Sequence, residues 1–255
     1  MPLNFNMNEF SKKIYGLIVA ILIYSVVLLQ INAAISNSMY HPQFAQKASR
    51  PLFLQKKYFR KVDKYVTDRS PQSILLIGDS MSKWLRYRLQ DYCEANNHHL
   101  STVTWVSGNT KWFAETDTLN YYIKKYDASY VILVLGSNEL FIRNIEKNRA
   151  GFVDEITETL SAVKWVWIGP PNWKNDSGIN KMLMGKLGKD RFFLSKDLKF
   201  QRQSDGMHPT VKSCSMWVDS IASWITHTSR SRILLDIPTG KRKVLKPDAL
   251  VLKPI

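Results

Sequence analysis

The run YVILVL at Tyr130–Leu135 constrains the fold of this chain more than any other stretch. It is apolar throughout, whereas a strand with one face in water alternates apolar and polar side chains. A short apolar run bounded by polar segments is typical of a central strand in a parallel sheet that is covered on both faces. Similar runs recur at Ser73–Ile77, Thr102–Val106, Val163–Ile168 and Arg191–Leu194.

Helical patterns separate these runs. They cover Ser82–Asn96, Asp117–Tyr126, Ala150–Ala162, Gly178–Leu187 and Thr210–Thr226. Strands that alternate with helices predict an α/β domain in which a parallel sheet carries helices on both faces. We place this domain at residues 73–228. We expect the basic tail at 229–255, which contains GKRK and prolines, to pack as an irregular arm or to be partly disordered.

An uncharged segment of 22 residues, Ile14–Ile35, precedes the domain. A membrane-spanning helix needs about 20 apolar residues, and the apolar part of a cleaved signal peptide has only about 7–15. The segment therefore predicts an uncleaved transmembrane signal anchor, although Ala34-Ile35-Ser36 also suits a cleavage site. The pair Lys12-Lys13 favours a cytoplasmic N-terminus at 1–13 and an exported domain after a linker at 36–72. The expected location is the inner membrane, with the domain on the periplasmic side.

The chain is strongly basic, with 36 Lys and Arg against 21 Asp and Glu and a formal net charge of +15. Such a charge favours an anionic neighbour: phospholipid headgroups, acidic polysaccharide or nucleic acid. The sequence has neither zinc-finger spacing nor the aromatic signature of an RNA-binding domain, so we expect no nucleic-acid partner. An unspecialised basic surface is the simpler alternative.

Polar motifs follow the predicted strands at the points where the strands end. They are Gly78-Asp79-Ser80, Ser107-Gly108-Asn109, Gly136-Ser137-Asn138-Glu139 and, before the last helix, Asp205-Gly206-Met207-His208-Pro209. In open α/β sheets, active sites form at the carboxyl ends of the strands. Each motif alone is also an ordinary turn or helix cap, but their joint occurrence indicates a catalytic site.

Ser80 is the candidate nucleophile of this site, because a serine hydroxyl beside a base can attack a carbonyl. His208 is the candidate base. Asp205 can hold the imidazole in one tautomer and stabilise the imidazolium, as in other Ser-His-Asp triads. Three donors are candidates for stabilising the developing oxyanion: the Ser80 N–H at a helix N-terminus, the Gly108 N–H and the Asn138 side-chain amide.

Four further side chains have both a site interpretation and a packing interpretation. Trp112 and Trp173 follow motifs at the strand ends, where their rings can line a substrate cleft or simply pack in the core. Lys83 and Trp84 can border the site, although a structural role at the start of the next helix is the simpler interpretation.

The histidine and cysteine positions argue against a metal site and a disulfide. His98 and His99 lie in a polar loop away from the strand ends, and the chain has no CxxC motif. Cys93 lies about 20 Å down the first helix, and Cys214 lies only about 9 Å down the last. A disulfide needs Cα atoms within about 7 Å, so we expect none between these two.

Together the four motifs resemble those of the SGNH (GDSL-like) hydrolase family, over about residues 73–226. The family's name-giving residues match Ser80, Gly108, Asn138 and His208, and its acid matches Asp205. The family often has Asp where this chain has Glu139. The resemblance implies a flavodoxin-like three-layer sandwich with a five-stranded parallel sheet, ester chemistry, and no metal or organic cofactor. The segment WIGPPNW looks most like a bacterial, envelope-facing subgroup.

These observations predict a serine esterase that removes acyl groups, O-acetyl above all, from carbohydrate at the cell envelope. The first alternative is an O-acetyltransferase that passes the acyl group from the same acyl-serine to a sugar of an exported polysaccharide. A transferase would need a membrane acyl-donor protein as partner. The second alternative is a catalytically silent protein that binds polysaccharide or serves as a membrane scaffold through its basic surface.

Overall fold

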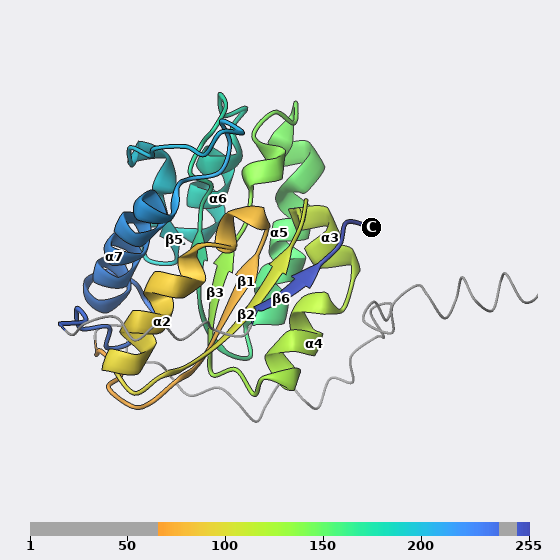
Figure 1. Cartoon of the computed structure of the whole chain (residues 1–255). Coiled ribbons are helices and arrows are strands. Elements are labelled where there is room, and N and C mark those ends of the chain that lie inside the picture. Colours follow the sequence, from red (N-terminus) through yellow and green to blue (C-terminus); the bar gives the residue numbers. More distant parts are fainter. Residues whose placement is uncertain (1–65, 240–248) are drawn as a thin grey trace, which may run out of the picture. The chain divides into compact units, whose positions relative to one another are not determined.

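The computed structural model describes residues 66–239 and 249–255 of the chain (Figure 1). The predicted cytoplasmic segment at 1–13 and the predicted anchor at 14–35 lie outside these residues, as does most of the predicted linker. Within the part of the chain that the structure describes, no helix is long and apolar enough to cross a membrane.

A parallel sheet of six strands forms the centre of the domain, in the order β5-β4-β3-β1-β2-β6. The strands are β1 (Ser73–Gly78), β2 (His99–Trp105), β3 (Tyr130–Val134), β4 (Lys164–Ile168), β5 (Phe192–Phe193) and β6 (Ala249–Leu252). All five neighbouring pairs run parallel. Every residue of β3 is buried, which confirms the central strand predicted from YVILVL.

Helices cover both faces of this sheet, as predicted (Figure 1). On one face α2 (Leu85–Ala95) packs beside α7 (Val211–His227). On the other, α5 (Ile145–Leu160) contacts α3 (Thr110–Glu115), α4 (Thr118–Lys125) and α6 (Ile179–Leu187). The core beneath α2 and α7 holds Tyr92, Tyr130 and Trp217, whose side chains are almost fully buried.

The expectation of five strands is wrong, because the sheet has a sixth strand formed by the tail. β6 pairs with β2 from Thr102 opposite Ala249 to Trp105 opposite Leu252. The pairing supplies backbone partners to an edge of β2 that a five-stranded sheet would leave open. The sequence hides β6 because its apolar run is only four residues long and is surrounded by lysines and prolines.

Two helical elements also begin differently from the expectation. The segment after β1 first makes a 3-10 turn, η2 (Ser80–Ser82), and α2 begins only at Leu85. The segment directly after Asn109, which lies outside the helical patterns of the sequence, forms the short helix α3. The Asn109 side chain explains this start, because its Oδ1 accepts a hydrogen bond from the Trp112 N–H at 3.1 Å.

Gly78 ends β1 because no other residue fits between β1 and β3. A Cβ atom at this position would lie 1.9 Å from the Val134 carbonyl oxygen, which is a steric clash with the backbone. The next residue uses the same carbonyl, since the Asp79 N–H donates to Val134 O at 2.9 Å. The close approach therefore fixes the direction in which the chain enters η2.

Deleting residues 249–255 should lower the melting temperature, because it removes the strand pairing of β6 and the hydrogen bond from Trp105 Nε1 to Lys253 O at 3.0 Å. A loss of about 1–3 kcal/mol corresponds to several degrees in a domain of this size, roughly 2–4 °C per kcal/mol. Circular dichroism melting measures the shift. The control V251T alters a side chain that is 48% exposed and should leave the melting temperature unchanged. An unchanged melting temperature in the truncated chain would contradict the assignment of β6.

Candidate active site

The structure brings together the three residues predicted as a triad. His208 lies with its Nε2 2.9 Å from Ser80 Oγ, although the two residues are 128 positions apart in the chain. On the other side of the ring, His208 Nδ1 lies 2.6 Å from Asp205 Oδ2. The arrangement has the geometry of a nucleophile, a base and a residue that orients the base.

The Asp205 carboxylate determines which ring nitrogen can act as the base. Its hydrogen bond with His208 and the backbone N–H groups of Met207 and His208 lower the pKa of Asp205 to about 2. An ionised carboxylate only accepts hydrogen bonds, so His208 Nδ1 must donate to it. Nε2 is then the acceptor, and it faces the Ser80 hydroxyl.

Arg202 fixes the turn that carries His208, and no motif in the sequence indicated this role. Its Nη1 donates to Met207 O at 2.7 Å, and its Nη2 donates to Asn172 O at 2.8 Å and also to Pro171 O. The guanidinium therefore joins the His208 turn to the loop after β4. Hydrogen bonds from an arginine to backbone carbonyls require no particular residue spacing, so no motif could have revealed this role.

Two of the three predicted oxyanion donors remain available in this geometry. Ser80 is the first residue of η2, and the first N–H groups of a helix have no acceptor within that helix. Asn138 uses Nδ2 to donate to Gly108 O at 2.9 Å, and the amide nitrogen carries a second N–H. The Gly108 N–H instead donates to Trp105 O at 2.9 Å. The Gly108 N–H can donate to an oxyanion only if its hydrogen bond to Trp105 O is shared or broken.

Asp79 joins the turn that contains Ser80 to the turn that contains Asn138. The sequence motif Gly78-Asp79-Ser80 by itself indicated only a turn or a helix cap. Asp79 Oδ1 accepts from Met81 N at 2.9 Å and Asp79 Oδ2 accepts from Ser137 N at 3.1 Å. The side chain is fully buried, and this burial raises the pKa of Asp79 to about 6, with a smaller contribution from the charge of Glu139.

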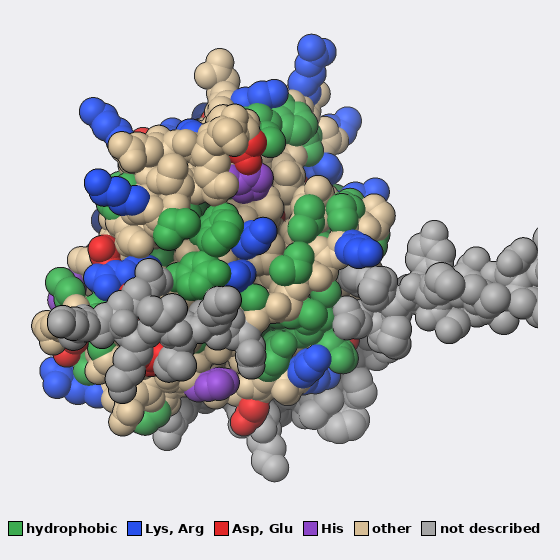
Figure 2. Space-filling model, viewed as in Figure 1, with side chains coloured by type: hydrophobic (Ala, Val, Ile, Leu, Met, Phe, Trp, Pro, Cys, Tyr) green, Lys and Arg blue, Asp and Glu red, His purple; other side chains and the backbone are tan. Residues whose placement is uncertain are grey.

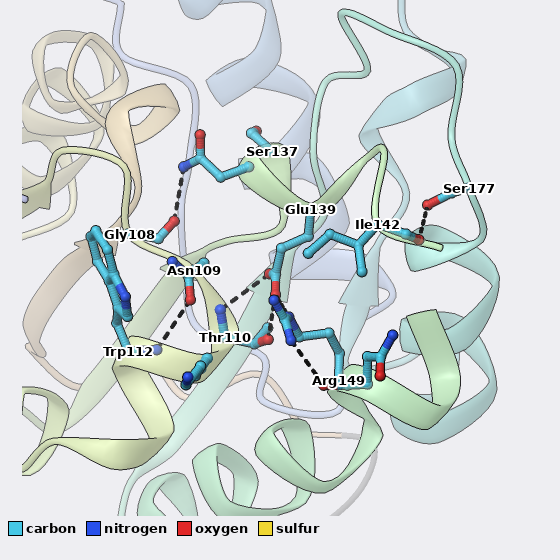
Figure 3. A network of polar contacts seen from close by, with 12 residues as sticks. Gly108, Asn109, Thr110, Trp112, Ser137, Glu139, Ile142, Arg149 and Ser177 are labelled. Carbon is cyan, nitrogen blue, oxygen red and sulfur yellow. Dashed lines mark hydrogen bonds and ion pairs between the residues drawn. The ribbon is translucent and has the colours of Figure 1, made fainter. Parts of the chain in front are cut away.

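Glu139 joins the Asn138 turn to the start of α3 (Figure 3). Its carboxylate accepts from Thr110 Oγ1 at 2.5 Å and from Thr110 N at 3.1 Å, and it forms an ion pair with Arg149 at 2.7 Å. Burial raises the pKa of the Glu139 carboxyl, while the Thr110 bonds and the Arg149 charge oppose that shift. This network and the bond from Asn138 to Gly108 hold the segments 107–109 and 136–139 against each other.

Both tryptophans that were candidates for lining a cleft have packing contacts. Trp112 packs on Trp105, with ring centroids 5.5 Å apart. Trp173 donates from Nε1 to Ser137 O at 3.2 Å and packs against Phe141 at 6.4 Å. Through this hydrogen bond to Ser137 O, the Trp173 side chain supports the Asn138 turn directly.

His98 has hydrogen-bond partners on both ring nitrogens, whereas His99 is the exposed first residue of β2 and not part of the expected loop. His98 accepts from the Gln72 N–H at Nδ1, which leaves Nε2 to donate to Leu234 O at 2.7 Å. Cys93 and Cys214 are free thiols, and burial raises the pKa of both. Among residues 66–239 and 249–255, no cluster of His, Cys, Asp and Glu side chains is arranged to hold a metal ion.

Comparison with known proteins gives similarity only at the level of solved structures, since no family model and no curated protein matches the chain. The psychrotrophic esterase EstA from Pseudoalteromonas is 17% identical over 60% of this chain and 98% of its own, with a TM-score of 0.45. The family 3 carbohydrate esterase of Clostridium thermocellum is 15% identical, with coverages of 60% and 94% and a TM-score of 0.46. The catalytic domain of Streptococcus pneumoniae peptidoglycan O-acetyltransferase A is 17% identical, with coverages of 60% and 92% and a TM-score of 0.41.

The buried Asp79 carboxyl should make the folding stability depend on pH. Its pKa is 3.8 in the unfolded chain and about 6 in the folded one, so the folded state binds this proton more tightly. The resulting stability is present below about pH 4 and is lost as the pH rises through about 6. Between pH 4 and 7, the unfolding free energy of the wild type should therefore fall by on the order of 2–3 kcal/mol relative to D79N.

Urea denaturation of the wild type and D79N at several pH values across this range measures the difference. A difference that stays constant from pH 4 to 7 would show that Asp79 titrates at its ordinary pKa in the folded protein.

Proposed function

We propose that the chain is a serine ester hydrolase of the SGNH type that removes acyl groups, most often O-acetyl, from carbohydrate. The proposal rests on the chain of hydrogen bonds that runs from Ser80 Oγ through the His208 ring to the Asp205 carboxylate. In addition, the Ser80 N–H and the Asn138 amide lie on the two turns that Asp79 joins. A nucleophile, an oriented base and oxyanion donors together make up the machinery of acyl transfer.

The first half of the reaction forms an acyl-serine. Ser80 Oγ attacks the ester carbonyl carbon while His208 Nε2 takes the hydroxyl proton, and the carbonyl oxygen becomes an oxyanion. The Ser80 N–H and Asn138 stabilise that oxyanion, and Asp205 stabilises the imidazolium. The C–O bond to the sugar then breaks, and His208 Nε2 returns the proton to the leaving sugar oxygen.

The second half returns the enzyme to its starting state. A water molecule attacks the acyl carbon and gives its proton to His208 Nε2. The bond from carbon to Ser80 Oγ breaks as the imidazolium protonates that oxygen, and the free carboxylic acid leaves. If a sugar hydroxyl replaces the water, the same steps give an O-acetyltransferase, so the products formed with and without a sugar acceptor distinguish the two reactions.

The carbohydrate substrate and the envelope location are further parts of the proposal. The uncharged segment at 14–35 supports an anchored, exported protein. The basic net charge of +15 supports an anionic neighbour, which at an envelope includes acidic polysaccharide.

The variant S80A should lower kcat for hydrolysis of p-nitrophenyl acetate by about 10³-fold or more, because it removes the nucleophile. The variant D205N should also lower kcat strongly, because a neutral amide no longer fixes the tautomer of His208. S161A is a matched control, since Ser161 is an exposed serine at the end of α5. Activity of S80A within tenfold of the wild type would rule out the proposed mechanism.

The variant N138A should lower kcat by about 10²–10³-fold and change KM little, because an oxyanion donor acts mainly in the transition state. Asn138 also binds Gly108 O, so loss of folding is a competing explanation. Steady-state kinetics combined with the melting temperature separates the two. A rise in KM at unchanged kcat would contradict the assigned role of Asn138.

A further inference from the structure

We propose that Lys83, Trp84, Arg86 and Tyr87 form a subsite for a negatively charged sugar of the acylated glycan. The proposal rests on the proposed function and adds the charge class of the substrate. The four residues are referred to below as the α2 subsite.

The α2 subsite begins at the nucleophile itself. The Lys83 N–H donates to Ser80 O at 3.3 Å, and Trp84 is the residue that directly precedes α2. Tyr87 lies in the first turn of α2, so the subsite extends about one helical turn, ~5 Å, beyond η2. A molecule that binds there lies near the turn that carries Ser80.

Two aromatic rings form the apolar part of the subsite. The rings of Trp84 and Tyr87 are stacked, with centroids 5.8 Å apart and an angle of 24° between their planes. Both side chains are only half-buried. Flat, partly exposed aromatic faces with a few polar groups around them are typical linings of ligand sites.

Two cations lie against these rings. Lys83 Nζ is 5.2 Å from the centroid of the Trp84 ring. Arg86 Cζ is 4.7 Å from the Tyr87 ring and 6.0 Å from the Trp84 ring, and its Nη2 donates to Tyr87 Oη at 3.0 Å. The rings and the hydrogen bond hold the Arg86 guanidinium in place, which reduces the entropy that an anion must overcome on binding.

Neither cation is neutralised by a carboxylate in the described part of the chain. The next arginine on the same helix behaves differently, since Arg88 binds Asp219 at 2.7 Å and Asp91 at 3.5 Å. Lys83 and Arg86 have no such ion pair among the described residues, and Arg86 Nε is buried there without an acceptor. Two cations that have no ion pair among residues 66–239 and 249–255, on an aromatic surface, fit a ligand that carries both an apolar ring face and a negative charge.

The space-filling view agrees with this arrangement. Hydrophobic and basic side chains adjoin one another over η2 and the start of α2 (Figures 1 and 2). The position of the subsite on the turn that follows Ser80 favours the substrate as the occupant. An acylated glycan that contains a uronic acid has the required ring face and charge. An anionic lipid surface is a competing occupant that the experiment must distinguish.

The test compares the full-length wild type with the double variant K83Q/R86Q on two acetylated polymers, polygalacturonate and the neutral mannan. The ratio of kcat/KM for the acidic polymer to kcat/KM for the neutral polymer should fall about tenfold in the variant. This is the change in binding expected from the loss of two partly exposed ion pairs with the substrate. Salt should reduce the same ratio in the wild type, because it screens the charges. The control K124Q, an exposed lysine of α4, should leave the ratio unchanged.

A ratio that stays within twofold of the wild type in K83Q/R86Q would overturn the proposal. Binding without turnover gives a second readout, in which S80A and S80A/K83Q/R86Q are compared by affinity electrophoresis in unacetylated polygalacturonate. Weaker retardation of the triple variant supports the subsite even if no ester is hydrolysed, so failure of the proposed function remains distinguishable. If the charge changes abolish binding to phosphatidylglycerol vesicles but leave polygalacturonate retardation intact, a lipid surface is the occupant and the proposal is wrong.

Discussion

The buried carboxylate of Asp79 is the interaction on which the rest of the site depends. It lies between β1 and the turn after β3, and its two oxygens bind a backbone N–H from each side. The turns that carry Ser80 and Asn138 therefore have a fixed separation before any substrate arrives. Fixed donors of this kind stabilise an oxyanion without reorganisation, which is where most of their catalytic effect arises. The cost is a buried carboxyl whose pKa rises to about 6.

Connections from distant parts of the chain complete the support of the site. β6 holds the end of β2 through the bond from Val106 N to Leu252 O at 3.0 Å, two residues before Gly108. Arg202 holds the His208 turn against the loop after β4. The C-terminal residues and the loop between β5 and α7 thus contribute to the positions of the motifs without belonging to any of them.

The sequence predicted the alternation of strands and helices and the grouping of Ser80, His208 and Asp205 at one site, because both leave strong local signals. An entirely apolar run such as YVILVL identifies a central strand, and polar motifs after strands indicate the catalytic edge. It did not predict β6, whose four residues are too short to show a period of two. It also missed Arg202 and the bond between Gly108 N and Trp105 O, since contacts with backbone carbonyls place no requirement on residue spacing.

Covalent labelling with a fluorophosphonate tests the central claim, that Ser80 is a nucleophile activated by His208, most directly. Mass spectrometry of the labelled chain should show one adduct, on Ser80, and H208A should form that adduct at least about 10²-fold more slowly, because the hydroxyl then lacks its base. The absence of an adduct on Ser80, or equal labelling rates in the wild type and H208A, would contradict the account.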